Sequence, residues 1–195
     1  CFVLTNSRSL PEAEAAAINR EIATNLLAAA GETGRGFAIA SRSDSTLRGH
    51  FPAETDALAA ALGGVDGVLL VPAFFEGGRL TAGDVHWVRD GDRLVPAAET
   101  EFARDATFGY THSNLREWVA EKTNGRIPAE DVASISLDEI RRGGPEQVAA
   151  KLATLRAGHF VTTGTCAVPL DLRPTGESIT ADYGALGRMA VRFTP

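Results

Sequence analysis

The sequence predicts an α/β fold, a three-layer α/β/α domain with a mainly parallel sheet and a β-hairpin insertion. Short apolar runs alternate with amphipathic helical patterns along the chain, which is typical of parallel strands covered by helices on both faces. An Asp-Gly pair between two apolar runs predicts the hairpin. The chain has 195 residues, of which 44% are hydrophobic, enough for one domain with a sizeable core.

The beginning of the chain predicts one strand and one long helix. An apolar run is already under way at Cys1–Thr5, which suggests a strand entered in its middle and an earlier segment in the natural protein. Ser9–Glu12 has the Ser-x-x-Glu form of a capping box, so a helix is expected from there to about Ala30. Its apolar stripe consists of Ile18, Ile22 and Leu26.

A strand, a helix and another strand follow. Gly31–Gly36 is a predicted turn, and the short apolar run Phe37–Ala40 predicts a buried strand. The next helix is expected at Pro52–Leu62, because the pair Gly63-Gly64 can end it. Val68–Val71 is a continuous apolar run and predicts another buried strand.

The second half of the chain predicts the hairpin and a further helix. The hairpin strands are Val85–Val88 and Arg93–Val95, on either side of the Asp-Gly pair. A helix is expected at Ser113–Lys122, because apolar residues repeat there at helical spacing. Its buried face consists of Leu115, Trp118 and Val119.

The last elements are less regular. Val132–Leu137 predicts a strand, and a helix carrying Val148, Leu152 and Leu155 follows it. His159–Thr163 has the composition of one more strand. Pro169–Pro195 shows no clear period and is expected to be a poorly packed tail, so we place the domain at residues 1–158 and an uncertain tail at 159–195.

The loop Ser41–His50 carries the strongest functional signal. It holds two guanidiniums, one carboxylate and four hydroxyls, from Arg42, Arg48, Asp44, Ser41, Ser43, Ser45 and Thr46. Guanidiniums match carboxylates or phosphates, while Asp and Ser exchange hydrogen bonds with sugar hydroxyls. The loop also lies between a predicted strand end and a helix start, where open α/β sheets bind ligands. Capping and turn formation would explain about one or two of these residues, but not the arginines.

Three further segments carry polar or charged residues that could serve the same edge of the sheet. Glu76 and Arg79 follow the strand Val68–Val71, although a glycine-rich turn with solvated charges would look the same. Arg8 follows the first strand and could equally be a cation at a helix entry. Thr100–Tyr110 is charged and aromatic, and its aromatics could equally belong to the core.

Composition argues against several classes of function. A net charge of −6 and a pI near 5.2 argue against a nucleic-acid partner. No apolar stretch approaches the roughly 20 residues of a membrane span, so a cytoplasmic location is expected by default. The two cysteines and four histidines lack the spacing of a metal site, and no Walker loop occurs.

Several separated motifs resemble the four-carbon acid sugar kinase family. They occur in the family's order and extend from about residue 3 to about residue 155. The loop motif Asp44–Gly49 is the most distinctive of them. The others are Thr5–Arg8, Pro72–Phe74 with Gly78-Arg79, Thr100–Asp105 with Thr107–Tyr110, and Ser113–Leu115.

The resemblance implies the N-terminal, sugar-acid-binding domain of an ATP-dependent kinase for threonate, erythronate or 3-oxo-tetronate. The family's C-terminal nucleotide-binding domain and its opening Asp-Asp-x-Thr-Gly segment, the first candidate for the catalytic carboxylate, are not in this sequence. ATP and Mg²⁺ are therefore expected in the full-length enzyme and not on this chain alone, which would be inactive by itself. Expected partners are a small four-carbon sugar acid and the C-terminal domain; a homodimer is left open.

The resemblance also assigns the site residues. Arg48 is expected to bind the acid's carboxylate, and Asp44 with Ser45 its hydroxyls. Ser7, Arg8 and Arg79 are secondary candidates for the same pocket, and Arg42 stands where the family often has a lysine. The catalytic residue is unknown. A non-catalytic sugar-acid sensor remains an alternative, and a hydrolase or lyase using Asp44 with His50 is a weaker one, because these two residues have no fixed geometry in a loop.

Overall fold

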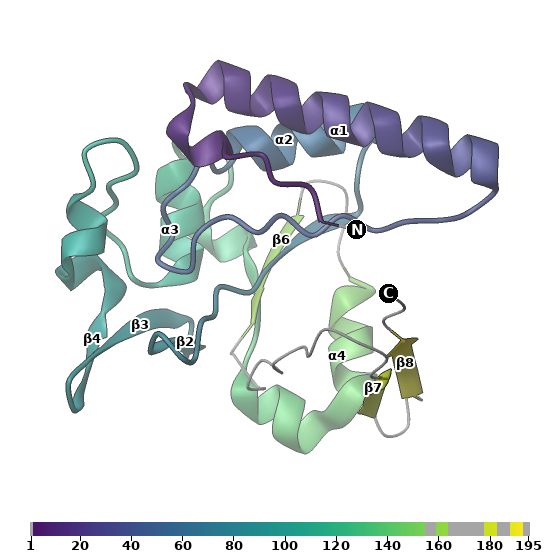
Figure 1. The fold of residues 1–195 in the computed structure, drawn as a ribbon. Helices are drawn as coiled ribbons and strands as arrows, with labels where there is room; N and C mark the ends of the chain where they lie inside the picture. Colours follow the sequence, from purple (N-terminus) through teal and green to yellow (C-terminus); the bar gives the residue numbers. More distant parts are fainter. Residues whose placement is uncertain (1, 155–158, 164–177, 183–187, 193–195) are drawn as a thin grey trace.

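The computed structural model describes residues 2–154, 159–163, 178–182 and 188–192, and it confirms the α/β class (Figure 1). The helices are α1 (Glu12–Thr33), α2 (Ala53–Ala61), α3 (Leu115–Lys122) and α4 (Gly144–Leu152). The strands are β1 (Gly67–Leu70), β2 (Arg79–Ala82), β3 (Val85–Asp90), β4 (Arg93–Pro96), β5 (Ala133–Ile135), β6 (His159–Thr163), β7 (Ser178–Asp182) and β8 (Arg188–Arg192). Short 3₁₀ turns lie at Ser7–Ser9, Ala97–Glu99, Glu101–Arg104 and Ala129–Asp131, and a π-helical turn at Glu139–Gly143 precedes α4.

A three-stranded parallel sheet has the order β1-β6-β5. β6 pairs with β1 through Val68↔Phe160 and with β5 through Ala133↔Val161. The strands predicted near these positions are therefore confirmed. Since β6 begins one residue after the predicted domain limit at residue 158 and lies between the other two strands, the sheet continues into the segment that was assigned to the tail.

A second sheet is antiparallel and has the order β2-β3-β4. The predicted hairpin is confirmed: Trp87 pairs with Pro96, and Gly91 in the connecting turn has a φ of 56° that favours glycine. β2 was not predicted, because its residues follow a glycine-rich turn. The prediction of one mainly parallel sheet is therefore wrong, since the described strands form three sheets, of which only one is parallel. The three-layer arrangement stays a prediction.

Two predicted strands are not strands. Residues 2–6 and 36–44 are irregular. Phe2 and Leu4 are 92% and 87% exposed, so they do not have the burial expected of a strand inside a parallel sheet. The predicted tail contains the antiparallel pair β7-β8, with Thr180 opposite Ala190, rather than irregular chain alone. Cys1, Leu155 and Cys166 lie outside the described residues.

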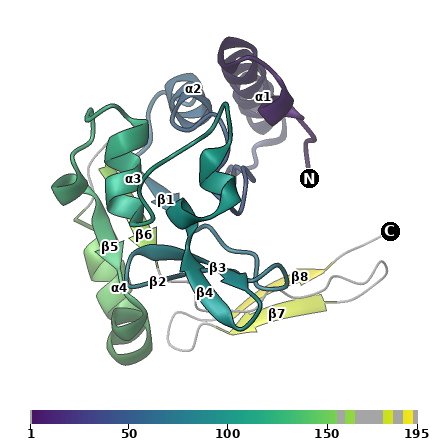
Figure 2. The same ribbon diagram turned by 90° about the vertical axis from the view of Figure 1, so that its left-hand side faces the viewer.

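The long helix α1 packs against α2, and Figures 1 and 2 both show the two side by side. Its buried residues are Ala15, Asn19 and Ala23, whereas the predicted stripe Ile18, Ile22 and Leu26 is half-buried. The predicted capping box is wrong, because Pro11 is the N-cap and the Ser9 hydroxyl donates to the Asn6 carbonyl instead. No helix among the described residues is long and apolar enough to cross a membrane.

The contact between α1 and α2 contains a buried polar link that we expect to matter for stability. Asn19 Nδ2 donates to the Ala15 carbonyl at 2.9 Å and to Glu54 Oε1 at 3.0 Å, and Glu54 is 8% exposed. Asn19→Ala removes a donor from a buried carboxylate, so it should lower the free energy of unfolding by about 1–3 kcal/mol in urea titrations. Asn25→Ala on the exposed side of the same helix is the control and should change it by less than about 0.5 kcal/mol. Equal effects would contradict this assignment.

The hydrophobic core joins α3 to the antiparallel sheet. Leu115, Trp118 and Val119 are buried as predicted and pack in one cluster with residues of the hairpin and the 41–50 loop, including Val88 and Leu47. Asn114 caps α3, because its side-chain oxygen accepts from the Arg116 N–H. The Leu115 N–H donates to the Asp84 carbonyl at 2.8 Å, which ties the start of α3 to the turn before β3. Because Leu47 belongs to this cluster, the hydrophobic core also holds the 41–50 loop in place.

Candidate functional site

The 41–50 loop connects the irregular segment before it to α2, and its backbone is fixed at two points. Leu47 has a φ of 66°, which is rare for a residue with a branched side chain, and its side chain is 5% exposed within the core. At Gly49, an added Cβ would lie 2.2 Å from Ser43 Oγ. The loop therefore closes on itself at Gly49, and a larger residue there would force Ser43 to move.

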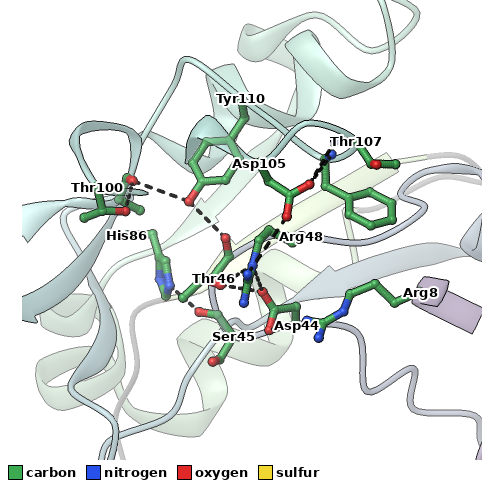
Figure 3. Close-up of polar contacts among 12 residues, drawn as sticks. Arg8, Asp44, Ser45, Thr46, Arg48, His86, Thr100, Asp105, Thr107 and Tyr110 are labelled. Atoms are coloured by element: carbon green, nitrogen blue, oxygen red, sulfur yellow. Dashed lines mark hydrogen bonds and ion pairs between the residues drawn. The ribbon is translucent and has the colours of Figure 1, made fainter. Parts of the chain in front are cut away.

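The carboxylate of Asp44 is the centre of the polar contacts in this loop (Figure 3). Its Oδ2 accepts from Arg48 Nε at 2.8 Å and from the Thr46 hydroxyl, while Oδ1 lies 3.2 Å from an Arg8 Nη1. Burial alone would raise the pKa of Asp44. The hydrogen bonds from Arg48 and Thr46 and the charges of Arg48 and Arg8 outweigh that effect and hold the pKa below its usual 3.8.

The lowered pKa of Asp44 predicts a pH dependence of stability. A carboxyl whose pKa is lower in the folded state stabilises the fold above its unfolded pKa, and this contribution is lost as pH falls through the folded pKa. The free energy of unfolding should therefore decrease below pH 3.8, and less steeply in Asp44→Asn than in the wild type. Urea titrations of both proteins at a series of acidic pH values measure this. Parallel curves would show that Asp44 does not contribute.

Arg48 and Arg79 reach the same aromatic ring from two different segments. The guanidinium carbon of Arg48 lies 5.0 Å from the centroid of Phe102, and that of Arg79 lies 5.2 Å from it. Arg79 is also 5.6 Å from the Phe74 centroid, and its Nη1 donates to the Gly77 carbonyl at 2.6 Å. These cation-π contacts bring together the three segments that the sequence had singled out separately.

Asp105 adds a second carboxylate on the other side of Arg48. Its Oδ2 lies 4.0 Å from an Arg48 Nη1, and its Oδ1 accepts from the N–H groups of Thr107 and Phe108. These backbone hydrogen bonds lower the pKa of Asp105, so it is ionised at neutral pH. Asp105 belongs to the charged segment Thr100–Tyr110 but was not a predicted site residue.

Two side chains that were not among the predicted site residues hold the backbone of the loop. His86 Nε2 lies 2.7 Å from the Ser45 carbonyl, and the Tyr110 hydroxyl donates to the Thr46 carbonyl at 2.9 Å. Both side chains are buried. Sequence spacing gave no signal for His86: Val85 and Trp87 share one face of the predicted strand and His86 and Val88 the other, so the pattern does not show that His86 is buried.

The structure brings together four of the predicted site residues and separates the others. Arg8, Asp44, Arg48 and Arg79 form one continuous cluster with Phe102 and Asp105. Ser45 contributes its carbonyl to His86, and its side chain is half-buried. Ser7 accepts from the Thr5 hydroxyl within its own turn, and Arg42 and Glu76 are exposed.

His50 does not pair with Asp44 in the manner that a hydrolase or lyase reading requires. Its Nε2 is 2.9 Å from the Leu10 carbonyl, and its ring packs edge-on against Phe108 at 4.8 Å. His50 is 5% exposed. Its imidazole therefore connects the loop to the start of α1, which is a structural role.

A cavity of about 990 Å³ lies beside the loop. Its polar wall consists of Ser41–Ser45, which includes Arg42 and Asp44, and its apolar wall includes Phe37, Leu69 and Phe74. A small polar molecule could enter beside Asp44 through this space. Among the described residues, no group of three or more His, Cys, Asp or Glu side chains could hold a metal ion.

Comparisons with known proteins identify the family of this chain. Residues 1–179 match the model of the family described as sugar-binding N-terminal domain. A D-threonate kinase of Bordetella bronchiseptica is 38% identical over 113 residues, which are 58% of this chain and 26% of that protein. The chain therefore spans about a quarter of the length of this curated relative.

Solved structures show the same fold. A Bordetella bronchiseptica protein described as a domain of unknown function, crystallised with bound citrate as a domain-swapped dimer, is 30% identical with a TM-score of 0.57. The match covers 84% of this chain and 35% of that one. A Haemophilus influenzae protein with 19% identity and a TM-score of 0.52, matched over 82% of this chain and 36% of that one, shows the fold alone. The chain belongs to the sugar-binding N-terminal domain family of the four-carbon acid sugar kinases.

Proposed function

We propose that this chain binds a four-carbon sugar acid of the threonate, erythronate or 3-oxo-tetronate type as the substrate-binding part of an ATP-dependent kinase. The observation that carries the proposal is the cluster of Arg8, Arg48 and Arg79 around Asp44 and Asp105. Its guanidiniums outnumber its carboxylates, although the chain as a whole carries a net charge of −6. A local excess of guanidinium attracts a small anion.

The guanidiniums of the cluster suit the carboxylate of a sugar acid, and its carboxylates suit the hydroxyls. We assign the acid's carboxylate to the guanidiniums of Arg48 and Arg79, since Arg79 Nε is a buried donor without a hydrogen-bond partner among the described residues. We assign the acid's hydroxyls to the Asp44 carboxylate and the Ser45 hydroxyl, which line the cavity. Arg8 extends the cationic side, and Ser7 and Arg42 remain proposed contacts at the margin of the pocket.

The proposed contribution to phosphoryl transfer is the placement of the acceptor. A kinase must hold the acceptor hydroxyl in line with the γ-phosphate. Contacts that fix both the carboxylate and the hydroxyls of the acid would hold it in that orientation. ATP and Mg²⁺ would supply the phosphoryl group and charge neutralisation. We propose, from the family resemblance, that a C-terminal nucleotide-binding domain supplies their site, and we assign no step through Mg²⁺ to this chain.

Calorimetric titration tests the proposal directly. D-threonate, L-threonate, D-erythronate and 3-oxo-tetronate are titrated into the protein, with succinate as a four-carbon dicarboxylate that lacks hydroxyls. We expect saturable binding of one hydroxy acid and much weaker binding of succinate. Succinate has no hydroxyl to donate to Asp44, and the Asp44 carboxylate would repel its second carboxylate. Equal affinities for all the acids would reduce the site to a general anion site, and no binding by a folded protein would refute the proposal.

A non-catalytic sugar-acid sensor is the second candidate, and the same binding geometry would serve it. The two differ in their response to nucleotide. A kinase couples acid binding to ATP, so a non-hydrolysable ATP analogue should change the affinity of the full-length natural protein for the acid. An affinity that is indifferent to the analogue would favour the sensor.

A further inference from the structure

Consecutive carbonyl groups of the 41–50 loop are each held by a side chain from another part of the fold. His86 on β3 contacts the Ser45 carbonyl at 2.7 Å, and Tyr110 donates to the Thr46 carbonyl at 2.9 Å (Figure 3). The Tyr110 hydroxyl is also 3.4 Å from the Ala97 carbonyl. These contacts span 41 and 64 residues of sequence, so they fix the loop relative to the hairpin and to the segment before α3.

The partners of His86 determine which ring nitrogen carries its proton. A carbonyl oxygen can only accept, so Nε2 must be the protonated nitrogen. Nδ1 then carries a lone pair and accepts from the Thr81 hydroxyl, which lies 3.0 Å away, closer than the 3.3 Å between this hydroxyl and the Pro72 carbonyl. Thr81 and His86 face each other across β2 and β3, and both are almost completely buried. The imidazole therefore has one defined orientation.

The electrostatic surroundings keep His86 neutral. Burial and the charge of Arg79 lower the pKa of His86 to about 4, although the hydrogen bond to Ser45 and the charge of Asp44 act in the opposite direction. Tyr110 is likewise neutral, because burial and the charge of Asp44 raise its pKa to about 12. Both side chains therefore act as neutral hydrogen-bond donors near neutral pH, and neither is poised to transfer a proton.

We propose that His86 and Tyr110 are positioning residues that hold the Ser45 and Thr46 carbonyls and thereby present Asp44 and Arg48 to the acid. Asp44 directly precedes the two anchored residues, and Arg48 follows them after Leu47, so the orientation of the anchored peptide planes influences where both side chains begin. A displacement of about 1 Å is enough to lose much of an oriented interaction. This inference rests on the function proposed above.

The test uses variants that remove each anchor and one that restores it. His86→Leu and Tyr110→Phe each remove a donor, whereas His86→Gln keeps an N–H at a reach similar to that of Nε2. Thr123→Val is the matched control, because it removes a buried hydroxyl that bonds to Val119 within the α3 region, away from the loop. Hydrogen exchange at residues 44–50 without ligand and calorimetric affinity for the acid are measured for each folded protein.

The expected result is exchange at least about tenfold faster across residues 44–50, and affinity at least about tenfold weaker, in His86→Leu and Tyr110→Phe. His86→Gln should restore most of the slow exchange and most of the affinity. Thr123→Val should leave both unchanged and lower only the thermal midpoint. Wild-type exchange and affinity in the two anchor variants, or equal losses in Thr123→Val, would overturn the inference.

Two outcomes separate this inference from the proposed function. If the wild type binds none of the acids, the proposed function fails, and the exchange data alone decide whether the loop is anchored. If His86→Leu does not fold, Tyr110→Phe decides, since it removes a single oxygen and leaves the ring in the core.

Discussion

Arg48→Ala is expected to weaken binding of the sugar acid by at least about 1.5 kcal/mol, a factor of ten or more in Kd, the scale of a charge-assisted hydrogen bond. The reason goes beyond the loss of one contact with the ligand. Arg48 Nε also donates to Asp44 at 2.8 Å and to the Thr46 hydroxyl at 3.0 Å, so the same substitution leaves the Asp44 carboxylate with fewer donors. The acid would therefore lose the guanidinium that binds its carboxylate, and Asp44 would lose a contact that holds it in position.

Calorimetry with two comparison variants measures this effect. Arg48→Lys keeps the positive charge but has no planar fork, so its affinity should lie between those of the wild type and Arg48→Ala. Arg20→Ala removes one positive charge from the exposed side of α1 and should leave the affinity unchanged. The assignment of Arg48 is wrong if Arg48→Ala binds the acid as tightly as Arg20→Ala does.

Trp118→Ala is expected to have the largest effect on stability, lowering the free energy of unfolding by about 3–5 kcal/mol. Trp118 is 3% exposed and stacks on Phe51, with ring centroids 4.7 Å apart and planes at 26°. Alanine would leave a cavity between α3 and the residue that follows the 41–50 loop. Since a domain of this size is stable by only about 5–15 kcal/mol, the variant should lose a large fraction of its stability.

Trp118→Phe is the matched control for this prediction. It keeps an aromatic ring against Phe51, and it removes the indole N–H, which is buried without a hydrogen-bond partner among the described residues. The expected loss is therefore below about 1.5 kcal/mol. Urea unfolding of both variants measures the difference; equal losses would show that ring stacking does not account for the stability of this contact.

The sequence predicted those elements whose pattern depends on local spacing. The repeat of Leu115, Trp118 and Val119 predicted α3 and its buried face, and the Asp-Gly pair predicted the β3-β4 hairpin. Strand pairing depends on neighbours far along the chain, and the apolar run Phe37–Ala40 reads as a strand whether or not a partner lies beside it. The residues of β2 carry little strand signal of their own, and they form a strand because they pair with β3.

The candidate site shows the same division. The loop chemistry identified Asp44 and Arg48, since their charges are informative without any coordinates. Asp105, His86 and Tyr110 join the site only through contacts between distant segments, and spacing along the chain carries no such information. Ser7, a secondary candidate from the family resemblance, accepts from the Thr5 hydroxyl within its own turn, and its contact with the acid stays a prediction.

The position of β6 in the parallel sheet has a consequence for folding and for the choice of expression boundaries. β1 ends at residue 70 and β5 begins at residue 133, yet β6, which starts at residue 159, is the strand that joins them. The sheet therefore cannot close until the last of its strands has left the ribosome, and contacts of such long sequence separation slow folding. A truncated protein ending at residue 158 would expose the inner edges of both β1 and β5, and it should aggregate rather than fold.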